Sequence, residues 1–282
     1  MTAKQDSPAL LSIKDVQKVF GGLMALNRVT FDVRSGEIIA LIGPNGAGKT
    51  TLFNVITNFH PLDGGEIIFA GKPLNGLRPD QIAQGGIVRT FQNLRIFHNM
   101  TVLENAMVGM HLQGASGIVS AALRLPAARE EEKRFHDIAY QYLEMVGIEN
   151  RAHDLASSLP FGQQRLLEIG RALAANPRLL LLDEPAAGLT RAETEALDEL
   201  ICSLRDQGLT ILLVEHDMEL VMNIADRVVV LHYGTRIATG TPEEVQANPD
   251  VIGAYLGADW QQDKWLEWML EDSNPNVEKA DA

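Results

Sequence analysis

One stretch, from Ile38 to Phe59, limits what this chain can fold into more than any other. It opens with an apolar run that predicts a buried strand, 38–42. The next residues carry the pattern G-x-x-x-x-G-K-[ST], at Gly43, Gly48, Lys49 and Thr50. Apolar residues then recur at the spacing of one helix face, at Leu52, Val55, Ile56 and Phe59. Strand, glycine-rich loop and helix in this order predict a binding site for phosphate groups.

The residue types of this loop suit nucleotide phosphates bound together with Mg²⁺. Glycines let the backbone turn tightly enough for its N–H groups to face phosphate oxygens, and the following helix adds partial positive charge. Lys49 is then predicted to reach the β- and γ-phosphates, and Thr50 to bind Mg²⁺ through its hydroxyl. A glycine-rich turn that matches the pattern by accident is the alternative, and the flanking strand and helix argue against it.

The composition narrows the class of protein. With 46% hydrophobic residues in 282, the chain has enough apolar side chains for a buried core. A net charge of −13 argues against nucleic acid as a partner, because phosphate contacts need clustered Lys and Arg. No apolar run approaches the roughly 20 residues of a membrane span, and residues 1–10 lack a secretion signal, so we expect a cytosolic protein. The single cysteine, Cys202, lies in an apolar helix stripe and is interpreted as core filler.

Predicted strands and helices alternate along most of the chain, which indicates an α/β fold with a parallel sheet. Residues 10–20 and 29–33 alternate like the strands of a separate antiparallel sheet. Helices are predicted over 129–146 and from Gly162 to the Asn-Pro pair that begins at Asn176. The stretch from Leu112 to Pro126, rich in glycine and alanine, is interpreted as packing or contact surface.

Polar residues follow two apolar runs, 179–182 and 210–214, at the sheet edge where the carboxyl ends of parallel strands meet. Asp183 is predicted to hold Mg²⁺ opposite Thr50, and the adjacent Glu184 to orient and deprotonate the attacking water. His216 has the chemistry to donate to the γ-phosphate, with a structural polar residue as the alternative. The side-chain amide of Gln92 has the groups to contact both the metal and the water. Taken alone, this residue does not distinguish a role at the site from an ordinary polar residue.

Phe20 also has two interpretations. It ends a predicted strand and is followed by two glycines, so its ring is available to stack on an adenine. A lone aromatic at a strand end is equally typical of a core residue.

These motifs together resemble the nucleotide-binding subunits of ABC transporters, over residues 10–256. That family has a P-loop NTPase fold with a parallel-sheet, RecA-like core, an antiparallel β subdomain and an α-helical subdomain. The resemblance assigns the ATP-binding Walker A motif to Gly43, Pro44, Asn45, Gly46, Ala47, Gly48, Lys49, Thr50 and Thr51.

The resemblance also assigns the remaining roles. Gln92 occupies the Q-loop position, which adds it to Thr50 and Asp183 as a Mg²⁺ ligand and to the catalytic residues. Glu184 matches the catalytic glutamate after the Walker B strand. His216 matches the H-loop, and Phe20 the adenine-stacking position.

The family signature L-S-G-G-Q is altered here. The segment 159–165 reads Leu-Pro-Phe-Gly-Gln-Gln-Arg, so Pro160 replaces a serine whose hydroxyl normally meets the partner's γ-phosphate, and Phe161 replaces a glycine. Gly162 and Gln163 remain to bind phosphate, together with the helix N-terminus. The segment 186–190 that follows the Walker B motif also lacks the usual aspartate.

With these departures, the sequence resembles the ATPases of branched-chain amino acid importers. Of the two ATPase subunits in those importers, it resembles the longer, G-type one. The features that carry this resemblance are the Gln-Gln-Arg signature, Arg-Thr-Phe-Gln at 89–92, Glu-His-Asp at 215–217 and the segment 248–257. The resemblance implies an ATPase that energises import of leucine, isoleucine and valine. An ATPase subunit for another solute or a lipid is the alternative, and a non-transport ABC ATPase is less consistent with this sequence.

The same resemblance implies partners and domain boundaries. The partners are transmembrane permease subunits, a second ATPase subunit (a copy of itself or a shorter sister) and, indirectly, a periplasmic or extracellular amino-acid-binding protein. The chain would then lie on the cytoplasmic face of the inner membrane. We expect an ATPase domain over 10–256 with a helical subdomain inserted at about 93–165, and an acidic tail over 257–282 containing Trp260, Trp265 and Trp268.

Overall fold

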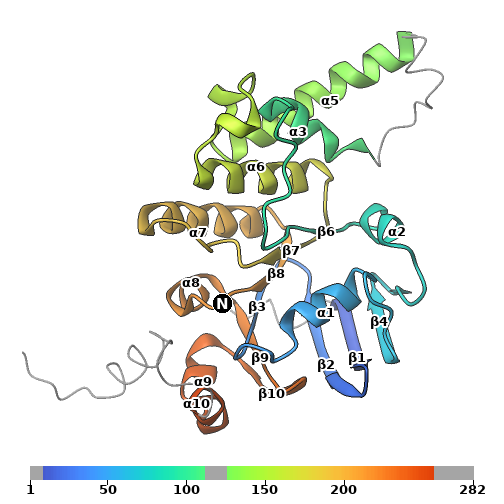
Figure 1. Cartoon of the computed structure of the whole chain (residues 1–282), viewed down its shortest axis with the longest axis vertical. Coiled ribbons are helices and arrows are strands. Elements are labelled where there is room, and N and C mark those ends of the chain that lie inside the picture. Colours follow the sequence, from blue (N-terminus) through green and yellow to red (C-terminus); the bar gives the residue numbers. More distant parts are fainter. Residues whose placement is uncertain (1–8, 112–125, 257–282) are drawn as a thin grey trace, which may run out of the picture.

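The computed structural model describes residues 9–111 and 126–256 (Figure 1), so the predictions for the tryptophan-containing tail and for most of 112–126 lie outside the described residues. A six-stranded sheet forms the centre, in the order β10-β9-β3-β8-β7-β6. All neighbouring pairs are parallel except β9 and β10. The strands are β3 (Ile38–Ile42), β6 (Ile87–Arg89), β7 (Leu179–Asp183), β8 (Thr210–Val214), β9 (Arg227–His232) and β10 (Thr235–Gly240).

Strands β3, β7 and β8 are apolar except for Asp183 and Thr210, because both faces of the sheet are covered. Every residue of β3, β7 and β8 is buried. Along β7 the side chains alternate between two cores, Leu180 and Leu182 in one and Leu179 and Leu181 in the other. A parallel sheet with two covered faces produces such continuous apolar runs, so the prediction of a parallel α/β core is confirmed.

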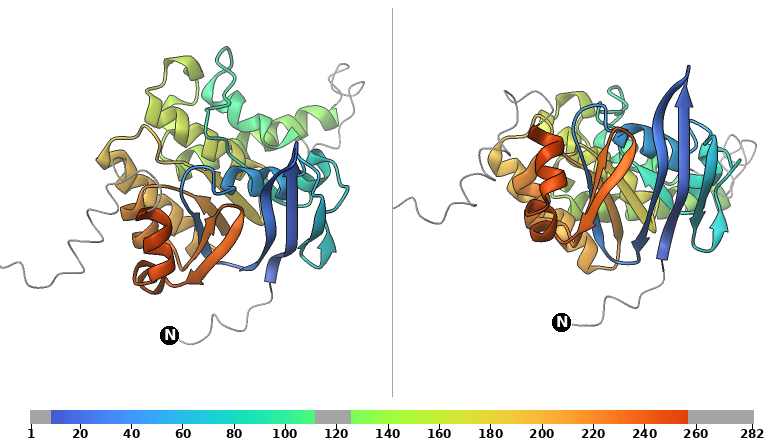
Figure 2. Two further views of the ribbon diagram at one scale, coloured as in Figure 1. Left: turned by 60° about the horizontal axis from the view of Figure 1, so that its bottom comes forward. Right: turned by 90° about the horizontal axis from the view of Figure 1, so that it is seen from below.

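A second sheet is antiparallel, as predicted, in the order β2-β1-β4-β5. Its strands are β1 (Ala9–Phe20), β2 (Leu23–Arg34), β4 (Gly64–Phe69) and β5 (Lys72–Pro73). The prediction placed the start of β2 too late, because β2 begins at Leu23 and pairs with β1 up to Phe20. Leu23 and Met24 are exposed, so this part of the strand has no buried face from which an alternating pattern could be recognised. In the view from below, β2 runs beside β10 (Figure 2).

Helix α1 (Lys49–Ile56) follows the glycine-rich loop and is shorter than predicted. Asn58 has a φ of 53°, a left-handed conformation that ends helices, and so Phe59 does not continue the apolar face. Phe59 is 54% exposed, and its ring meets that of Phe91 edge-on at 6.0 Å. The helix-face prediction was therefore right for Leu52, Val55 and Ile56, all buried, and wrong for Phe59.

Helices also lie between β6 and β7, at the top of Figure 1: α3 (Val102–Val108), α5 (Pro126–Met145) and α6 (Phe161–Ala174). They pack against one another closely, and a Cβ at Gly109 would lie 2.1 Å from the Arg171 carbonyl oxygen. The helices in the rest of the molecule are α2 (Pro79–Gln84), α7 (Arg191–Asp206), α8 (Met218–Ile224), α9 (Pro242–Gln246) and α10 (Pro249–Leu256). Within the described ranges, none of the helices has the length and apolarity needed to cross a bilayer.

Cys202, on α7, is partly buried and packs against the core that contains Leu182. Burial raises the pKa of its thiol, as expected for filler rather than for a reactive cysteine.

Candidate functional site

The glycine-rich loop joins β3 to α1, and its glycines are required by its geometry. Gly43 has a φ of 149°, and a Cβ there would lie 2.1 Å from the Leu231 carbonyl oxygen. Gly48 has a φ of 104°, and a Cβ there would lie 2.7 Å from the Ala25 carbonyl oxygen. No L side chain fits such positions without moving the backbone. The backbones of β2 and β9 therefore pack directly against the loop at these two glycines.

Lys49, the first residue of α1, lies across the loop. Its ammonium donates to the carbonyl oxygens of Gly43 at 2.5 Å and Pro44 at 3.2 Å. Thr50 is exposed, as are Asn45 and Gly46 in the loop itself. The helix N-terminus, the ammonium and the hydroxyl thus share one accessible corner, which suits phosphate oxygens.

Three predicted catalytic residues meet at the ends of β7 and β8. The Gln92 amide nitrogen donates to Glu184 Oε2 at 2.6 Å, and the His216 Nδ1 lies 3.7 Å from the same oxygen. Glu184 has a φ of 48°, a conformation that costs a non-glycine residue energy and that is concentrated at functional sites. Its backbone N–H donates to the Val214 carbonyl, which ties the end of β7 to that of β8.

Asp183 is buried beside Glu184, and Arg89 holds it. The Arg89 guanidinium donates to Asp183 Oδ2 at 2.7 Å, and both side chains are 5% exposed. The same guanidinium donates to Asn54 on α1 at 2.7 Å. Arg89 therefore connects the glycine-loop helix to the carboxylate of β7, a role that the sequence reasoning did not assign.

The oxygens available around Asp183 fit a hard divalent cation. Arg89 donates to Asp183 Oδ2, so the other carboxylate oxygen, Oδ1, is the one that can face a cation. The Gln92 side chain uses its amide nitrogen to donate to Glu184, so the side-chain oxygen of Gln92 can face a cation as well. Together with the Thr50 hydroxyl, these groups offer only oxygen donors, the type that Mg²⁺ prefers when phosphates complete its coordination. Among the described residues no cluster of three His, Cys, Asp or Glu side chains could hold a metal by itself.

Glu215, directly after β8, is a second residue that the sequence reasoning left without a role. It is 1% exposed, and its Oε1 accepts from Ala186 N at 2.8 Å, while Oε2 accepts from His216 N at 3.0 Å and Asp217 N at 3.3 Å. Burial raises the pKa of this carboxyl, and the three amides favour its charged form. Glu215 thus fixes the loop after Glu184 to the loop that carries His216. In the sequence, its position between a buried strand and His216 was the feature that could have indicated this role.

The altered signature segment begins α6. Pro160 is the N-cap residue. Gly162 is buried, and a Cβ there would lie 2.1 Å from Glu193 Oε1. Glu193 also forms a capping box with Thr190 at the start of α7. The Phe161 ring covers Gly188, where a Cβ would lie 3.0 Å from it. The substituted signature is thereby packed against the segment after Glu184.

The structure does not bring every predicted site residue together. Gly162 and Gln163 start α6 in the helical part of the molecule, whereas Lys49 starts α1 beside the antiparallel sheet (Figure 1). Phe20 ends β1 and is 41% exposed, with its ring 5.2 Å from that of His60, so the core interpretation of Phe20 is wrong. Stacking on adenine stays a prediction.

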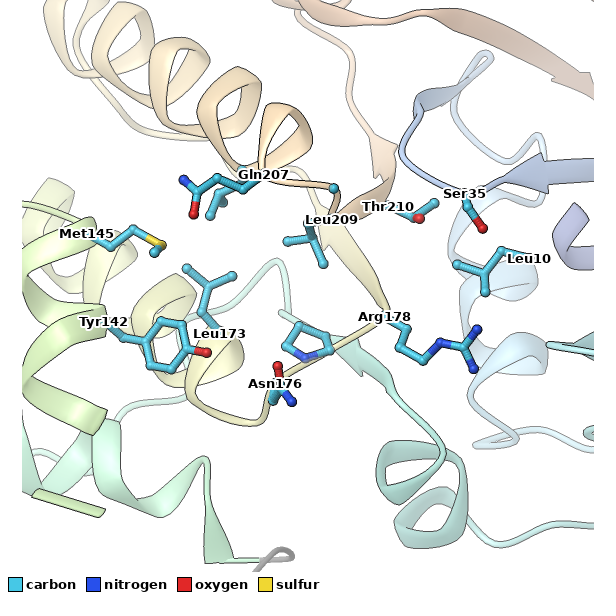
Figure 3. Close-up of a pocket in the computed structure, with 13 residues that line it drawn as sticks. Leu10, Ser35, Tyr142, Met145, Leu173, Asn176, Arg178, Gln207, Leu209 and Thr210 are labelled. Carbon is cyan, nitrogen blue, oxygen red and sulfur yellow. The ribbon is translucent and has the colours of Figure 1, made fainter. Parts of the chain in front are cut away.

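The described residues also form a pocket of about 360 Å³ at the other edge of the sheet, where β7 and β8 begin (Figure 3). Tyr142, Asn176, Arg178 and Thr210 are among its lining residues. None of the predicted site residues in the described part of the chain lines this pocket. It lies at the end of the sheet where β7 and β8 begin, opposite the end that carries Glu184.

Comparison with known proteins identifies the family. The ABC transporter family model matches residues 26–187. LivG of Salmonella typhimurium, a high-affinity branched-chain amino acid transport ATP-binding protein, is 50% identical over 252 residues, 89% of this chain and 99% of that protein. The chain belongs to the ABC transporter ATPases. It is therefore an ATP-binding, ATP-hydrolysing subunit coupled to transport, which confirms that prediction.

Further matches refine this placement among ABC transporter ATPases. Residues 235–260 match the model for branched-chain amino acid ATP-binding cassette transporters. BraF of Pseudomonas aeruginosa, also a high-affinity branched-chain amino acid transport ATP-binding protein, is 45% identical over 89% of this chain and 99% of that protein. The crystal structure of a nucleotide-free ATP-binding cassette from an ABC transporter superposes with a TM-score of 0.77 at 34% identity, covering 88% of this chain and 99% of that one. The predicted ABC ATPase fold is confirmed.

Proposed function

We propose that this ABC transporter ATPase energises the import of branched-chain amino acids through a membrane permease. The observation that carries the proposal is 50% identity to LivG along nearly the whole of both chains. The match of residues 235–260 to the branched-chain model supports it independently, because that segment lies beyond the general ABC match.

The geometry of the site supports the roles proposed for its residues. Lys49 and the loop N–H groups bind the β- and γ-phosphates, and Thr50, Asp183 and Gln92 hold Mg²⁺. When bound, Mg²⁺ neutralises charge on the phosphate oxygens. Glu184 accepts the proton of the attacking water, and its contact with Gln92 at 2.6 Å sets the position of its Oε2.

His216 and Phe20 complete the proposed roles. His216 is 64% exposed and lies beside Glu184, where its imidazole donates to the γ-phosphate. The exposed ring of Phe20 stacks on the adenine.

One copy of the chain provides only part of each nucleotide site, and a second ATPase subunit completes it. Gly162 and Gln163 lie in the first turn of α6, which is apart from α1, the helix that begins at Lys49 (Figure 1). In the proposed dimer they approach the γ-phosphate held by the partner's loop, with the α6 N-terminus as an anion site. A bacterial ABC transporter cassette with a dimeric structure, which has a TM-score of 0.70 at 26% identity, supports the dimer. The partner is a copy of this chain or a shorter sister subunit.

We divide the chain into an ATPase domain, 10–256, with a helical insertion at about 93–165, and a tail, 257–282. The part of the chain that meets the permease, on the cytoplasmic face of the membrane, is the Q-loop with most of this insertion, about Gln92 to Leu159. An amino-acid-binding protein outside the membrane delivers the substrate to that permease.

The test is stimulation of ATP hydrolysis in a reconstituted complex. The chain is co-purified with branched-chain amino acid permease subunits from the same organism, placed in proteoliposomes, and mixed with a branched-chain amino-acid-binding protein. Leucine-loaded binding protein should raise hydrolysis well above the rate with the same protein free of leucine. Equal rates with and without leucine, together with stimulation by a different solute or a lipid, would assign the chain to another ABC system.

A further inference from the structure

Arg165, on α6, is a buried charged residue outside the predicted site. It is 1% exposed. Its guanidinium donates to the backbone carbonyl oxygens of Phe91 and Gln92, each at 3.0 Å, and to Glu168 Oε2 at 2.9 Å. A planar guanidinium has several N–H donors in a fixed fork, so it can bind two carbonyls and a carboxylate at once. The compact ammonium of a lysine does not offer this geometry.

Glu168, also 1% exposed, holds the other side of the same segment. Its Oε1 accepts from Arg95 N at 3.3 Å, so the Arg165–Glu168 pair contacts the backbone both at Gln92 and three residues beyond it. Burial raises the pKa of Glu168, while Arg165 and the Arg95 amide favour its charged form. Arg171 lies 4.0 Å from the same carboxylate.

Fold stability does not by itself explain this pair. Taking two charges out of water is expensive, and apolar residues of similar size often stabilise a fold equally well. What the charges achieve is directional: residues 91–95 form neither helix nor strand, and Arg165 and Glu168 bond their carbonyls and one N–H.

We propose that Arg165 and Glu168 are positioning residues that fix the Gln92 segment to α6, so that the Gln92 side chain stays in contact with Glu184. The pair lies on α6, whose first turn contains Gly162, so movement at the signature end of α6 is transmitted to the hydrolytic glutamate. This inference rests on the roles proposed above for Gln92 and Gly162.

The test compares variants of the full chain. In Arg165→Met/Glu168→Met both members of the pair are replaced by apolar side chains, so neither is left buried without the other. Arg165→Lys keeps a charge but loses the second carbonyl contact. Arg151→Gln/Asp154→Asn removes a more exposed ion pair with the same i,i+3 spacing and serves as the matched control. Gln92→Ala is the reference for loss of the positioned side chain.

Each variant is measured for melting temperature, affinity for a fluorescent ATP analogue, kcat and KM of hydrolysis, and hydrogen exchange of the peptide spanning 90–97. The double methionine variant should fold and bind nucleotide like the wild type. Its kcat should fall by about tenfold to a hundredfold, since small misplacements of catalytic groups cost that much. Exchange at 90–97 should become faster, with Arg165→Lys intermediate and the control unchanged.

The proposal is overturned if the double methionine variant keeps the wild-type kcat while Gln92→Ala loses activity, or if exchange at 90–97 is unaffected. A wild-type kcat in Gln92→Ala would instead overturn the role proposed for Gln92, and exchange at 90–97 would then decide on the anchoring alone. If the double variant does not fold, Arg165→Lys carries the same two readouts.

Discussion

The Gln92 amide nitrogen lies 2.6 Å from Glu184 Oε2, although 92 positions separate the two residues in the chain. The contact joins the segment after β6 to the end of β7, and Arg165 holds the backbone of Gln92 from the other side. Glu184, expected to deprotonate water, and Gln92, expected to bind the metal, are thus in direct contact.

Glu184→Gln should bind ATP but hydrolyse it slowly. The amide keeps the shape of the side chain but cannot accept a proton, so kcat should fall by about 10²–10⁴-fold. Phosphate release and binding of a fluorescent ATP analogue measure the two properties separately. Glu199→Gln, an exposed change on α7, is the control. Normal turnover in Glu184→Gln would remove this residue from the role.

Gly48→Ala should disrupt nucleotide binding. The added Cβ would lie 2.7 Å from the Ala25 carbonyl oxygen at a φ of 104°, so the loop must shift away from its phosphate-binding shape. Affinity for ATP, measured by calorimetry, should fall at least about tenfold, because unfavourable φ values alone cost about 1–3 kcal/mol. The matched change Gly253→Ala on α10, with no heavy atom within 4 Å of the new Cβ, should bind ATP normally.

Phe20→Ala should weaken binding of the base and leave binding of the phosphates intact. Stacking of a base on an aromatic ring contributes about 1–3 kcal/mol, so ATP affinity should fall about fivefold to a hundredfold. Inorganic tripolyphosphate should bind the variant as it binds the wild type, and Phe20→Tyr should restore ATP affinity. An equal loss of affinity for both ligands would point to a folding defect of the hairpin instead.

Hydrolysis should require Mg²⁺, and Thr50→Val should raise the Mg²⁺ concentration needed for half-maximal activity. The methyl group replaces the hydroxyl at nearly constant volume and removes one oxygen from the proposed ligand set. Titration of Mg²⁺ at saturating ATP gives the concentration directly, and chelation should abolish turnover in every variant. Thr194→Val, on α7, controls for the loss of a hydroxyl elsewhere. An unchanged Mg²⁺ requirement would exclude Thr50 as a ligand.

Asp198 should make the fold less stable as pH rises. Burial, with repulsion from Asp217 and other acids, raises its pKa from 3.8 to about 7, and its Oδ1 is buried without a hydrogen-bond partner among the described residues. A raised folded-state pKa stabilises the fold below the unfolded value, and that contribution is lost between about pH 4 and pH 7.

The asparagine variant isolates this effect. Asp198→Asn cannot ionise, so its melting temperature should exceed that of the wild type at pH 8 and the difference should shrink toward pH 5. A difference that stays constant across this range would show that Asp198 does not titrate in it.

The sequence by itself determined the elements whose information is local. Glycines at fixed spacing, continuous apolar strands and helical periodicity are properties of neighbouring residues, so the glycine-rich loop, the buried β7 and β8 and the polar residues at their ends were all predictable. The family motifs added the roles that spacing alone left open, as for Gln92.

Only the tertiary structure decided the contacts between distant segments. Arg89 with Asp183, Arg165 with the carbonyl of Gln92 and Glu215 with Ala186 N join residues that are 94, 73 and 29 positions apart. A buried arginine or glutamate looks like any other in a helix or strand pattern, because its partner is set by how the sheet and helices pack. The exposure of Phe59 and Phe20 was decided in the same way, since burial depends on what surrounds a side chain and not on its type.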